Sequence, residues 1–395
     1  MPTCVLSAFA QISPVAENVE QLWLALKNDV TGILPANNTV LKSLNINGIG
    51  FIGDTKNFNQ SDYNEKFILL LDKTLNQIAP QLSGVQQIDC IYLTFGIPDL
   101  RLEISSLNPI KFSLSEQIII HKISDFLKKI NIKPPIESSF IGIDAACASS
   151  TIAVSLASEK INSRQINNAL ILSIDIITES ILKGLYLLGV LATDQTAEPD
   201  KISRPFSASR TGFVRSESSC ALFLETYENS EIRNQSAYMK ILSSGISCDA
   251  EHVTAGSQSG QGIISAVKYC IEDIRIPISE IKLVKAHGTG TLINDHNESV
   301  ALNTVFKHPF EVYSAKGQFG HMASASGAFE IIICAYMFAN NLVLKSWNSE
   351  DLDLSLNLKP VLKTNENRNL NYILFNSSGF GGHNCCLLLE KIKQN

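Results

Sequence analysis

The residues best suited to covalent chemistry are one cysteine and, further along the chain, two histidines. Cys147 follows a short apolar run, 140–143, and directly precedes a stretch of small residues typical of a buried helix. A thiol at a helix start lies near unpaired backbone N–H groups, which can lower its pKa from about 8.5 to roughly 3.5–7.5 and produce a thiolate nucleophile. An inert, buried thiol is the competing interpretation, and position alone does not decide between the two.

Two of the seven histidines occupy positions from which a side chain could reach a ligand. His287 ends a β-rich run and opens the turn-forming segment 288–291, and His321 follows Gly320 at the start of a small-residue helix. The carboxyl ends of strands are where α/β folds place their ligands. Each histidine taken singly is more simply a hydrogen-bonded core residue. Two of them together with a cysteine at a helix start favour a nucleophilic site.

Charged residues and a glycine-rich bend accompany the histidines. Lys316 is either a surface charge or a cation held by Asp295 or Glu298, which otherwise serve as the N-cap and first-turn acids of a helix. The bend 377–383 lies between two β-rich runs and lacks the helix and acidic residue of a dinucleotide-binding loop. We expect its backbone N–H groups to approach a reacting carbonyl.

The elements that must position these residues follow a plan that occurs twice. An apolar helical face is followed by a proline, a β-rich run and another helix, and then by a short buried strand and a helix of small residues. We expect both small-residue helices at the centre of an α/β fold with mainly parallel strands, although chance similarity between ordinary α/β units is an alternative. The expected strands are 88–96, 140–143, 281–288, 312–314, 371–375 and 385–389, and the expected helices are 67–78, 114–130, 148–157, 263–274, 297–306 and 322–331.

The composition excludes several classes of protein. With 395 residues, 45% hydrophobic and 18% charged, the chain is too apolar to be disordered, and its net charge of −6 without a basic stripe argues against nucleic-acid binding. Nine irregularly spaced cysteines without a CxxC pair favour neither a disulfide framework nor a zinc site, so reduced cytoplasm is the expected compartment. No charged leader is present, and the apolar run 331–339 is too short to span a membrane.

Five motifs in order resemble the β-ketoacyl-(acyl carrier protein) synthases, the condensing enzymes of fatty acid and polyketide synthesis. The resemblance covers nearly the whole chain, and five motifs in order are far more specific than any one of them. The motifs are Asp144-Ala-Ala-Cys-Ala-Ser-Ser150, Arg204-Pro-Phe206 with Arg210 and Gly212-Phe-Val214, His287-Gly-Thr-Gly-Thr291 with Asn294-Asp295 and Glu298, Lys316 with Gly320-His321, and Gly379-Phe-Gly-Gly382.

The resemblance implies a thiolase-like fold of five layers, α-β-α-β-α, built from two similar halves. We expect a first half at 1–236 with the nucleophile and a second half at 237–395 with the catalytic histidines. It also implies a dimer, either of identical chains or with a related ketosynthase or chain-length factor. The implied partner is an acyl carrier protein, docked on a local basic patch near the tunnel mouth. No metal or organic cofactor is implied.

The resemblance also assigns roles to the candidate residues. Elongating members of the family use a Cys-His-His set, which here would be Cys147, His287 and His321. The sulfur would accept an acyl group, and both imidazoles would donate to the enolate formed when malonyl-carrier loses CO2. Lys316 would support the site and be held by Glu298 or a neighbour. Phe380 would act as an aromatic gate, and its backbone N–H would form an oxyanion hole together with the N–H of Cys147. Asp295 would also have a supporting role.

Departures from the family pattern leave two questions open. The segment 216–220 has lost its usual glycines, which suggests a specialised type II pathway for a polyene or pigment rather than housekeeping fatty acid synthesis. A chain-length-factor-like subunit that performs no condensation is the closest alternative, although such subunits usually lose the cysteine. A Cys-His hydrolase and a pure binding module fit the five motifs less well. Residues 176–188 are candidates for lining the acyl tunnel.

Overall fold

The computed structural model of the chain describes residues 3–58, 63–96, 116–194, 196–252, 256–272, 274–366 and 368–392. In the first half the helices and strands are β1 (Cys4–Ile12), α1 (Val19–Lys27), β2 (Leu34–Pro35), α2 (Thr39–Ser43), β3 (Gly48–Ile49), α3 (Tyr63–Ile78), β4 (Cys90–Gly96), α4 (Glu116–Lys129), β5 (Phe140–Gly142), α5 (Ser149–Asn162), β6 (Asn168–Asp175), α6 (Glu179–Leu187), β7 (Ser218–Thr226) and α7 (Tyr227–Ile232). In the second half they are β8 (Met239–Cys248), α8 (Gln261–Ile271), β9 (Leu283–Lys285), α9 (Leu292–Val305), β10 (Glu311–Tyr313), α10 (Lys316–Phe319), α11 (Ser326–Asn340), β11 (Tyr372–Gly379) and β12 (His383–Lys391).

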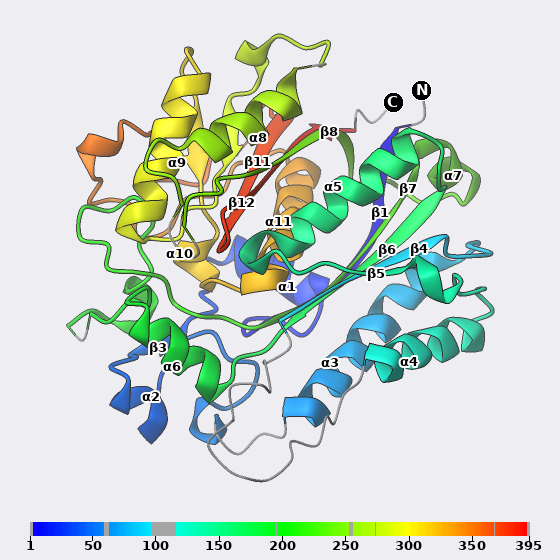
Figure 1. Ribbon diagram of the computed structural model, residues 1–395, viewed down its shortest axis with the longest axis horizontal. Helices are drawn as coiled ribbons and strands as arrows, with labels where there is room; N and C mark the ends of the chain where they lie inside the picture. The colour runs from blue at the N-terminus through cyan, green and yellow to red at the C-terminus, as the bar shows by residue number, and fades with distance from the viewer. Residues whose placement is uncertain are drawn as a thin grey trace.

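Helices and strands alternate in five layers, as expected. Helices α3 and α4 pack on the outer side of β4, β6 and β7, and α8 and α9 cover the outer side of the second-half strands (Figure 1). Helices α5 and α11 lie between the two sets of strands. This arrangement is a thiolase-like α-β-α-β-α fold.

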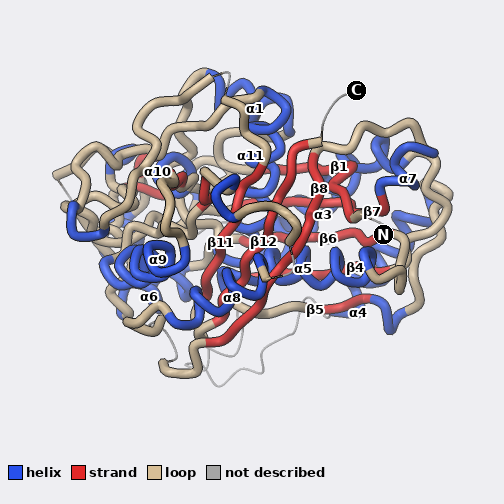
Figure 2. The backbone as a smooth tube through the Cα atoms, turned by 90° about the horizontal axis from the view of Figure 1, so that it is seen from above, coloured by secondary structure: helices blue, strands red, loops and turns tan. Residues whose placement is uncertain are grey.

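The strands of the two halves have the same order. Hydrogen bonds join the described strands into one sheet, β10-β9-β11-β12-β8-β1-β7-β6-β4-β5, so that β5-β4-β6-β7-β1 repeats as β10-β9-β11-β12-β8. Only three residue pairs, from Cys4↔Ile241 to Leu6↔Met239, link β1 to β8. The strands of the second half cross those of the first at a large angle in Figure 2.

The expectation of mainly parallel strands is wrong. In each half, as far as the structure describes it, two strand pairs are parallel and two are antiparallel. The reason in the second half is the tight hairpin between β11 and β12, which reverses the chain without a crossover helix. The expected helices and strands are present, with shifted ends; α9 begins at Leu292 and α11 runs on to Asn340.

The central helices begin with the same turn in both halves. Ala146 and Ala323 have φ values of 48° and 40°, which are unusual for residues with a Cβ. In the first turn the N–H of Ala145 donates to Ser149 Oγ at 2.9 Å, and in the second the N–H of Met322 donates to the corresponding Ser326 Oγ at 3.0 Å. The duplication seen in the sequence therefore extends to individual hydrogen bonds.

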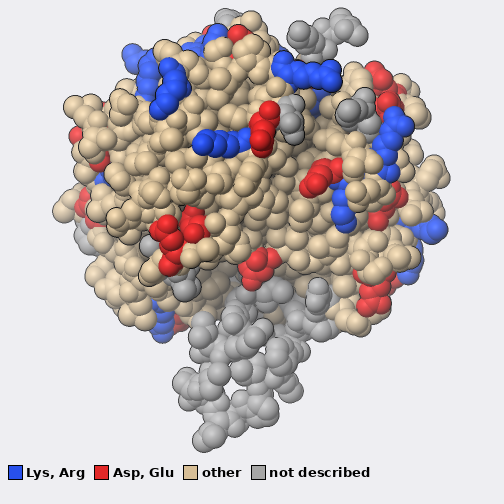
Figure 3. Space-filling view, turned by 45° about the horizontal axis from the view of Figure 1, so that its top comes forward, with Lys and Arg blue, Asp and Glu red and all other residues tan. Residues whose placement is uncertain are grey.

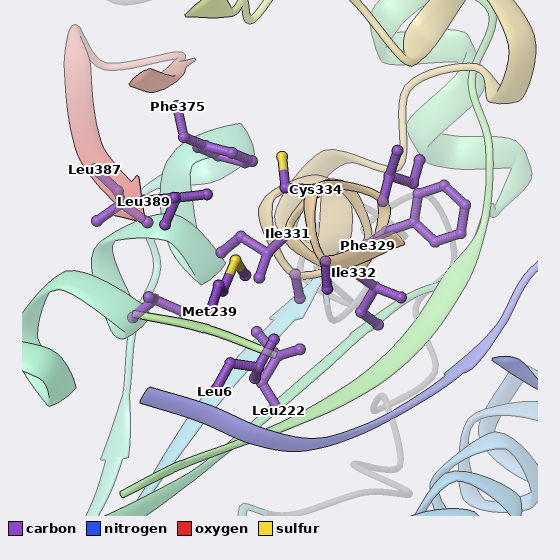
Figure 4. Packing of buried hydrophobic residues seen from close by; sticks show 14 of the residues in the cluster. Leu6, Leu222, Met239, Phe329, Ile331, Ile332, Cys334, Phe375, Leu387 and Leu389 are labelled. Carbon is purple, nitrogen blue, oxygen red and sulfur yellow. The ribbon is translucent and has the colours of Figure 1, made fainter. Parts of the chain in front are cut away.

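Helix α11 lies at the centre of the main hydrophobic core. Its apolar side chains meet Leu6 and Leu222 from first-half strands and Phe375 and Leu387 from second-half strands (Figure 4). The segment Ala323–Asn340 is long and apolar enough to cross a membrane, but 83% of it is buried inside the fold. Its hydrophobicity is therefore explained by packing within the protein.

Candidate active site

Four of the predicted residues line one cavity of about 330 Å³. They are Cys147, His287, His321 and Phe380. Cys147 comes from the turn before α5, His287 from the end of β9, His321 from the turn before α11, and Phe380 from the β11–β12 hairpin. The site is thus assembled from both halves of the chain.

Cys147 as a residue is half-buried, and the pKa of its thiol is raised rather than lowered. Burial raises this pKa to about 11, although the nearby cations of Arg215 and Lys316 lower it in part. Of the two forms that the sequence left open at Cys147, the raised pKa favours the thiol in the resting protein. At neutral pH the group is a thiol, and its proton must move to a base before the sulfur can attack.

The β11–β12 hairpin lies directly on the backbone around Cys147. A Cβ on Gly379 would lie 2.5 Å from the carbonyl oxygen of Ala145 and 3.2 Å from the nitrogen of Cys147. The hydroxyl of Ser377 donates to the carbonyl oxygen of Cys147 at 3.4 Å. Only glycine allows this approach, which brings the backbone before Phe380 against the nucleophile's turn.

Gly379→Ala should separate the hairpin from the Cys147 turn. We expect the free energy of unfolding to fall by about 1–3 kcal/mol, because backbone atoms must move to admit the methyl group. Acylation of Cys147 should slow as well. Urea unfolding and intact-mass measurement of the acyl adduct would test both effects.

Gly184→Ala is the matched control for this substitution. Gly184 lies inside α6, and a Cβ there would meet nothing within 4 Å. Alanine should therefore raise stability by about 0.5–1 kcal/mol through its higher helix propensity. A Gly379→Ala protein as stable and as readily acylated as the Gly184→Ala protein would contradict the structural argument.

The tautomer of His321 follows from its hydrogen bonds. The backbone N–H of Ala323 donates to Nδ1 at 3.2 Å, and Ser326 Oγ lies 2.9 Å from the same atom. Because Nδ1 accepts, the ring proton of a neutral His321 resides on Nε2. Burial lowers the pKa of His321 well below 6.5, and the cations of Lys316, Arg215 and Lys285 lower it further, so the ring is neutral at pH 7.

His287 stands beside His321, with the ring centroids 5.4 Å apart and the ring planes at 82°. Burial and then the charge of Lys316 lower the pKa of His287 well below 6.5, so this ring is also neutral. The carboxylate of Glu298 accepts the backbone N–H groups of His287 and Gly288 at 2.7 and 2.8 Å. Glu298 therefore fixes the turn that carries His287.

Comparison with known proteins identifies the family. The model described as "Beta-ketoacyl synthase, N-terminal domain" matches residues 130–230, and the model described as "Beta-ketoacyl synthase, C-terminal domain" matches residues 238–350. The chain belongs to the β-ketoacyl synthase family. It is thus a condensing acyltransferase, and the thiolase-like fold is the one expected of such a synthase.

Several relatives of this synthase match along nearly their whole length. The "3-oxoacyl-[acyl-carrier-protein] synthase 2" of Staphylococcus aureus (strain COL) is 25% identical over 98% of each chain. One solved structure of the same fold is a type II polyketide acyl carrier protein in complex with its ketosynthase, with TM-score 0.85, 20% identity and full coverage of both chains. Another is the ishigamide ketosynthase/chain length factor, with TM-score 0.82, 21% identity and coverage of 99% and 100%.

Lys316 of the synthase is held by a carboxylate that the sequence analysis missed. Its Nζ lies 2.6 Å from Oε1 of Glu330, and the expected partner Glu298 binds backbone N–H groups instead. Lys285 forms an ion pair with the other oxygen of Glu330, and its Nζ lies 3.9 Å from the centre of the Phe375 ring. The carboxylate and both amino groups are buried, and burial lowers the pKa of Lys285, so the three side chains form one coupled charge cluster near the histidines.

The carboxylate of Asp295 accepts hydrogen bonds from backbone N–H groups instead of binding Lys316. It accepts the N–H of Phe206 at 2.8 Å and of Gly290 at 3.2 Å, and Arg210 Nε lies 3.7 Å from it. Burial raises the pKa of Asp295 to about 6. Asp295 therefore joins the Arg-Pro-Phe and His-Gly-Thr-Gly-Thr motifs.

Of the segment proposed to line the tunnel, 176–188, only the last residue reaches the cavity in the described part of the chain.

Proposed function

We propose that the chain condenses an acyl group held on Cys147 with malonyl-acyl carrier protein to give a β-ketoacyl-acyl carrier protein. The observation that supports this proposal most directly is the common cavity of Cys147, His287 and His321. The Staphylococcus aureus relative carries the name of this reaction. Incubation with acyl and malonyl carriers, followed by mass measurement of the product, tests the proposal.

The first step is acyl transfer to Cys147. The thiol passes its proton to a neutral imidazole, the sulfur attacks the thioester carbonyl, and the carrier sulfur leaves and takes up a proton. The N–H groups of Cys147 and Phe380 would bind the oxygen that becomes negative. Removing one such donor typically slows a reaction by about 10²–10³-fold.

The second step forms the new carbon–carbon bond. The carbon–carbon bond to the malonyl carboxylate breaks and CO2 leaves. The electron pair of that bond forms an enolate on the thioester. Nε2–H of His321 donates to that oxygen together with a ring N–H of His287, which neutral imidazoles can supply. The enolate carbon then attacks the acyl carbonyl, and the sulfur of Cys147 leaves as a thiolate that takes up a proton from water to restore the thiol.

The carrier protein would dock against an apolar surface. Leu187, Leu188, Leu292 and Ile293, which we call the apolar lip, are 84%, 49%, 61% and 53% exposed, and the last three line the cavity. No lysine or arginine is among the described residues that line the cavity itself. On the face shown in Figure 3, acidic and basic side chains are interspersed among uncharged residues.

Leu292→Asp should weaken binding of the carrier protein without changing the chemistry at Cys147. We expect KM for acyl-carrier to rise about tenfold, because a carboxylate would be buried in an apolar contact. Acylation by a small thioester without a carrier should remain unchanged. Steady-state kinetics at low and high salt measure the effect, and KM of the unmodified enzyme should depend only weakly on salt.

Ile232→Asp is the control for the apolar lip. Ile232 is 79% exposed on α7, far from α6 and α9 (Figure 1). KM should be unchanged in this variant. An equal rise in both variants, or a strong salt dependence of KM, would contradict docking on the apolar lip.

We also propose that this chain is the catalytic subunit of a dimer rather than a chain-length factor. An intact Cys-His-His set in one cavity supports catalysis, although a related chain could complete a heterodimer as well as a second copy. The altered segment 216–220 supports a specialised pathway, and the nine free thiols support a reducing, cytoplasmic compartment. Turnover of simple saturated acyl carriers at a housekeeping rate would count against specialisation.

We propose a division of the chain into halves 1–236 and 237–395. The repeated strand order supports this boundary, because β8 opens the second set of five strands at Met239. The nucleophile then belongs to the first half and both histidines to the second.

A further inference from the structure

Asn297 is a buried side chain in the wall of the active-site cavity whose hydrogen-bonding groups are unused. It lies in the second turn of α9, is 3% exposed, and lines the same cavity as Cys147. Neither Nδ2 nor Oδ1 has a partner among the described residues. Most buried polar groups are hydrogen-bonded, and an unpaired one destabilises the fold. This amide therefore needs a partner that the described residues of the chain do not supply.

The polar side chains beside Asn297 are already paired with one another. Asp249 accepts from the amide of Asn384 at 3.0 Å and from the backbone N–H of Ser257 at 3.1 Å. Asn384 in turn accepts from the hydroxyl of Ser378 at 2.8 Å. These residues form a fixed polar wall. Asn297 is the member of this wall with a free donor and a free acceptor.

A glycine leaves the amide of Asn297 uncovered. A Cβ at Gly256 would lie 3.3 Å from Nδ2 of Asn297 and 3.3 Å from Oδ2 of Asp249. Gly256 also lines the cavity. A side chain at position 256 would thus lie beside both polar groups. Because Gly256 has no side chain, the Asn297 amide stays open to a ligand.

We infer that Asn297 binds a secondary amide in the prosthetic arm of the carrier protein, an assignment that rests on the proposed function. A secondary amide offers one N–H and one C=O, which match the free Oδ1 and Nδ2 of Asn297. The phosphopantetheine arm of a carrier protein contains two such amides, and it must enter this cavity for its thioester to reach Cys147. Asn297 is therefore a binding residue for the arm rather than for the acyl chain.

Asn297→Leu tests the assignment with two thioesters of the same acyl group. Leucine has a similar volume and no hydrogen-bonding group. The pantetheine thioester contains the arm's amides, whereas the ethanethiol thioester contains none. We expect kcat/KM for acylation of Cys147 by the pantetheine thioester to fall by about ten- to a hundredfold, the usual cost of losing one or two hydrogen bonds. The rate with the ethanethiol thioester should stay the same.

Asn303→Ala is the matched control on the same helix. The Asn303 amide already donates to the carbonyl oxygens of Ser299 and Leu356, at 2.9 and 3.0 Å. This variant should lose stability in urea but keep both acylation rates. Asn297→Leu should show the opposite: unchanged or increased stability, because an unpaired buried amide is removed, and a slower reaction with the pantetheine thioester alone.

The outcomes separate this inference from the proposed function. If the unmodified enzyme is acylated by neither thioester, the proposed function fails. If it is acylated by both and Asn297→Leu slows both equally or neither, the assignment of Asn297 is overturned while the proposed function stands. Selective loss with the pantetheine thioester supports the assignment.

Discussion

Cys147→Ala is expected to abolish both the acyl adduct and the condensation product. The sulfur is the atom that forms the thioester, and methyl cannot replace it. Loss of a nucleophile of this kind typically lowers turnover by roughly 10⁴-fold or more. Intact-mass measurement after incubation with a panel of acyl carriers would show the adduct on the unmodified protein and none on the variant.

Cys248→Ala is the control for this experiment. Cys248 is the exposed cysteine of the nine, so it is the thiol most open to unspecific acylation. This variant should form the adduct at the normal rate. Unchanged product from a reconstituted pair containing the Cys147→Ala chain would instead assign condensation to the partner, and this chain would then act as a chain-length factor.

Glu330→Gln is expected to cause the largest loss of stability. The substitution leaves the ammonium groups of Lys285 and Lys316 buried without a counter-charge. Breaking a buried ion pair in this way typically costs about 3–5 kcal/mol. Although burial tends to raise the pKa of Glu330, the two ammonium groups hold it below its ordinary value, so the carboxylate is ionised in the folded protein. Urea unfolding, followed by fluorescence, would measure the loss.

Lys285→Met is the control, because it removes one cation and leaves Glu330 paired with Lys316 at 2.6 Å. Replacing a buried cation by an apolar side chain of similar length should cost far less than removing the shared carboxylate. Combining it with Glu330→Gln should recover part of the loss. A Glu330→Gln protein as stable as the unmodified one would show that the three charges are not mutually dependent.

The sequence allowed the architecture and the composition of the site to be predicted. Apolar periodicity located the helices, and the duplicated plan indicated two halves, since both signals arise from burial of regular elements. Cys147, His287, His321 and Phe380 were expected at strand or helix ends, and the structure brings them to one cavity. Residues at such ends share one edge of a sheet. The position of a residue at the end of a strand or helix therefore indicated that it would lie near the site.

Long-range pairings were not predictable in the same way. Lys316 was expected to pair with Glu298, which is closer to the catalytic motif, and the structure pairs it with Glu330. A signal was present, because Glu330 is the single charge of an apolar helix and buried charges require partners. The raised pKa of Cys147 depends on how deeply the thiol is buried, which the sequence does not reveal.

The placement of α5 and α11 has a consequence for how the protein can be divided. Two family models meet near residue 237, yet the largest apolar cluster takes side chains from both sides of that boundary. The N–H of Ala328 even donates to the hydroxyl of Ser150 across it, at 3.0 Å. The strand order repeats in the two halves, but both halves share one interior, so cutting the chain near residue 237 would remove one wall of that interior from each fragment.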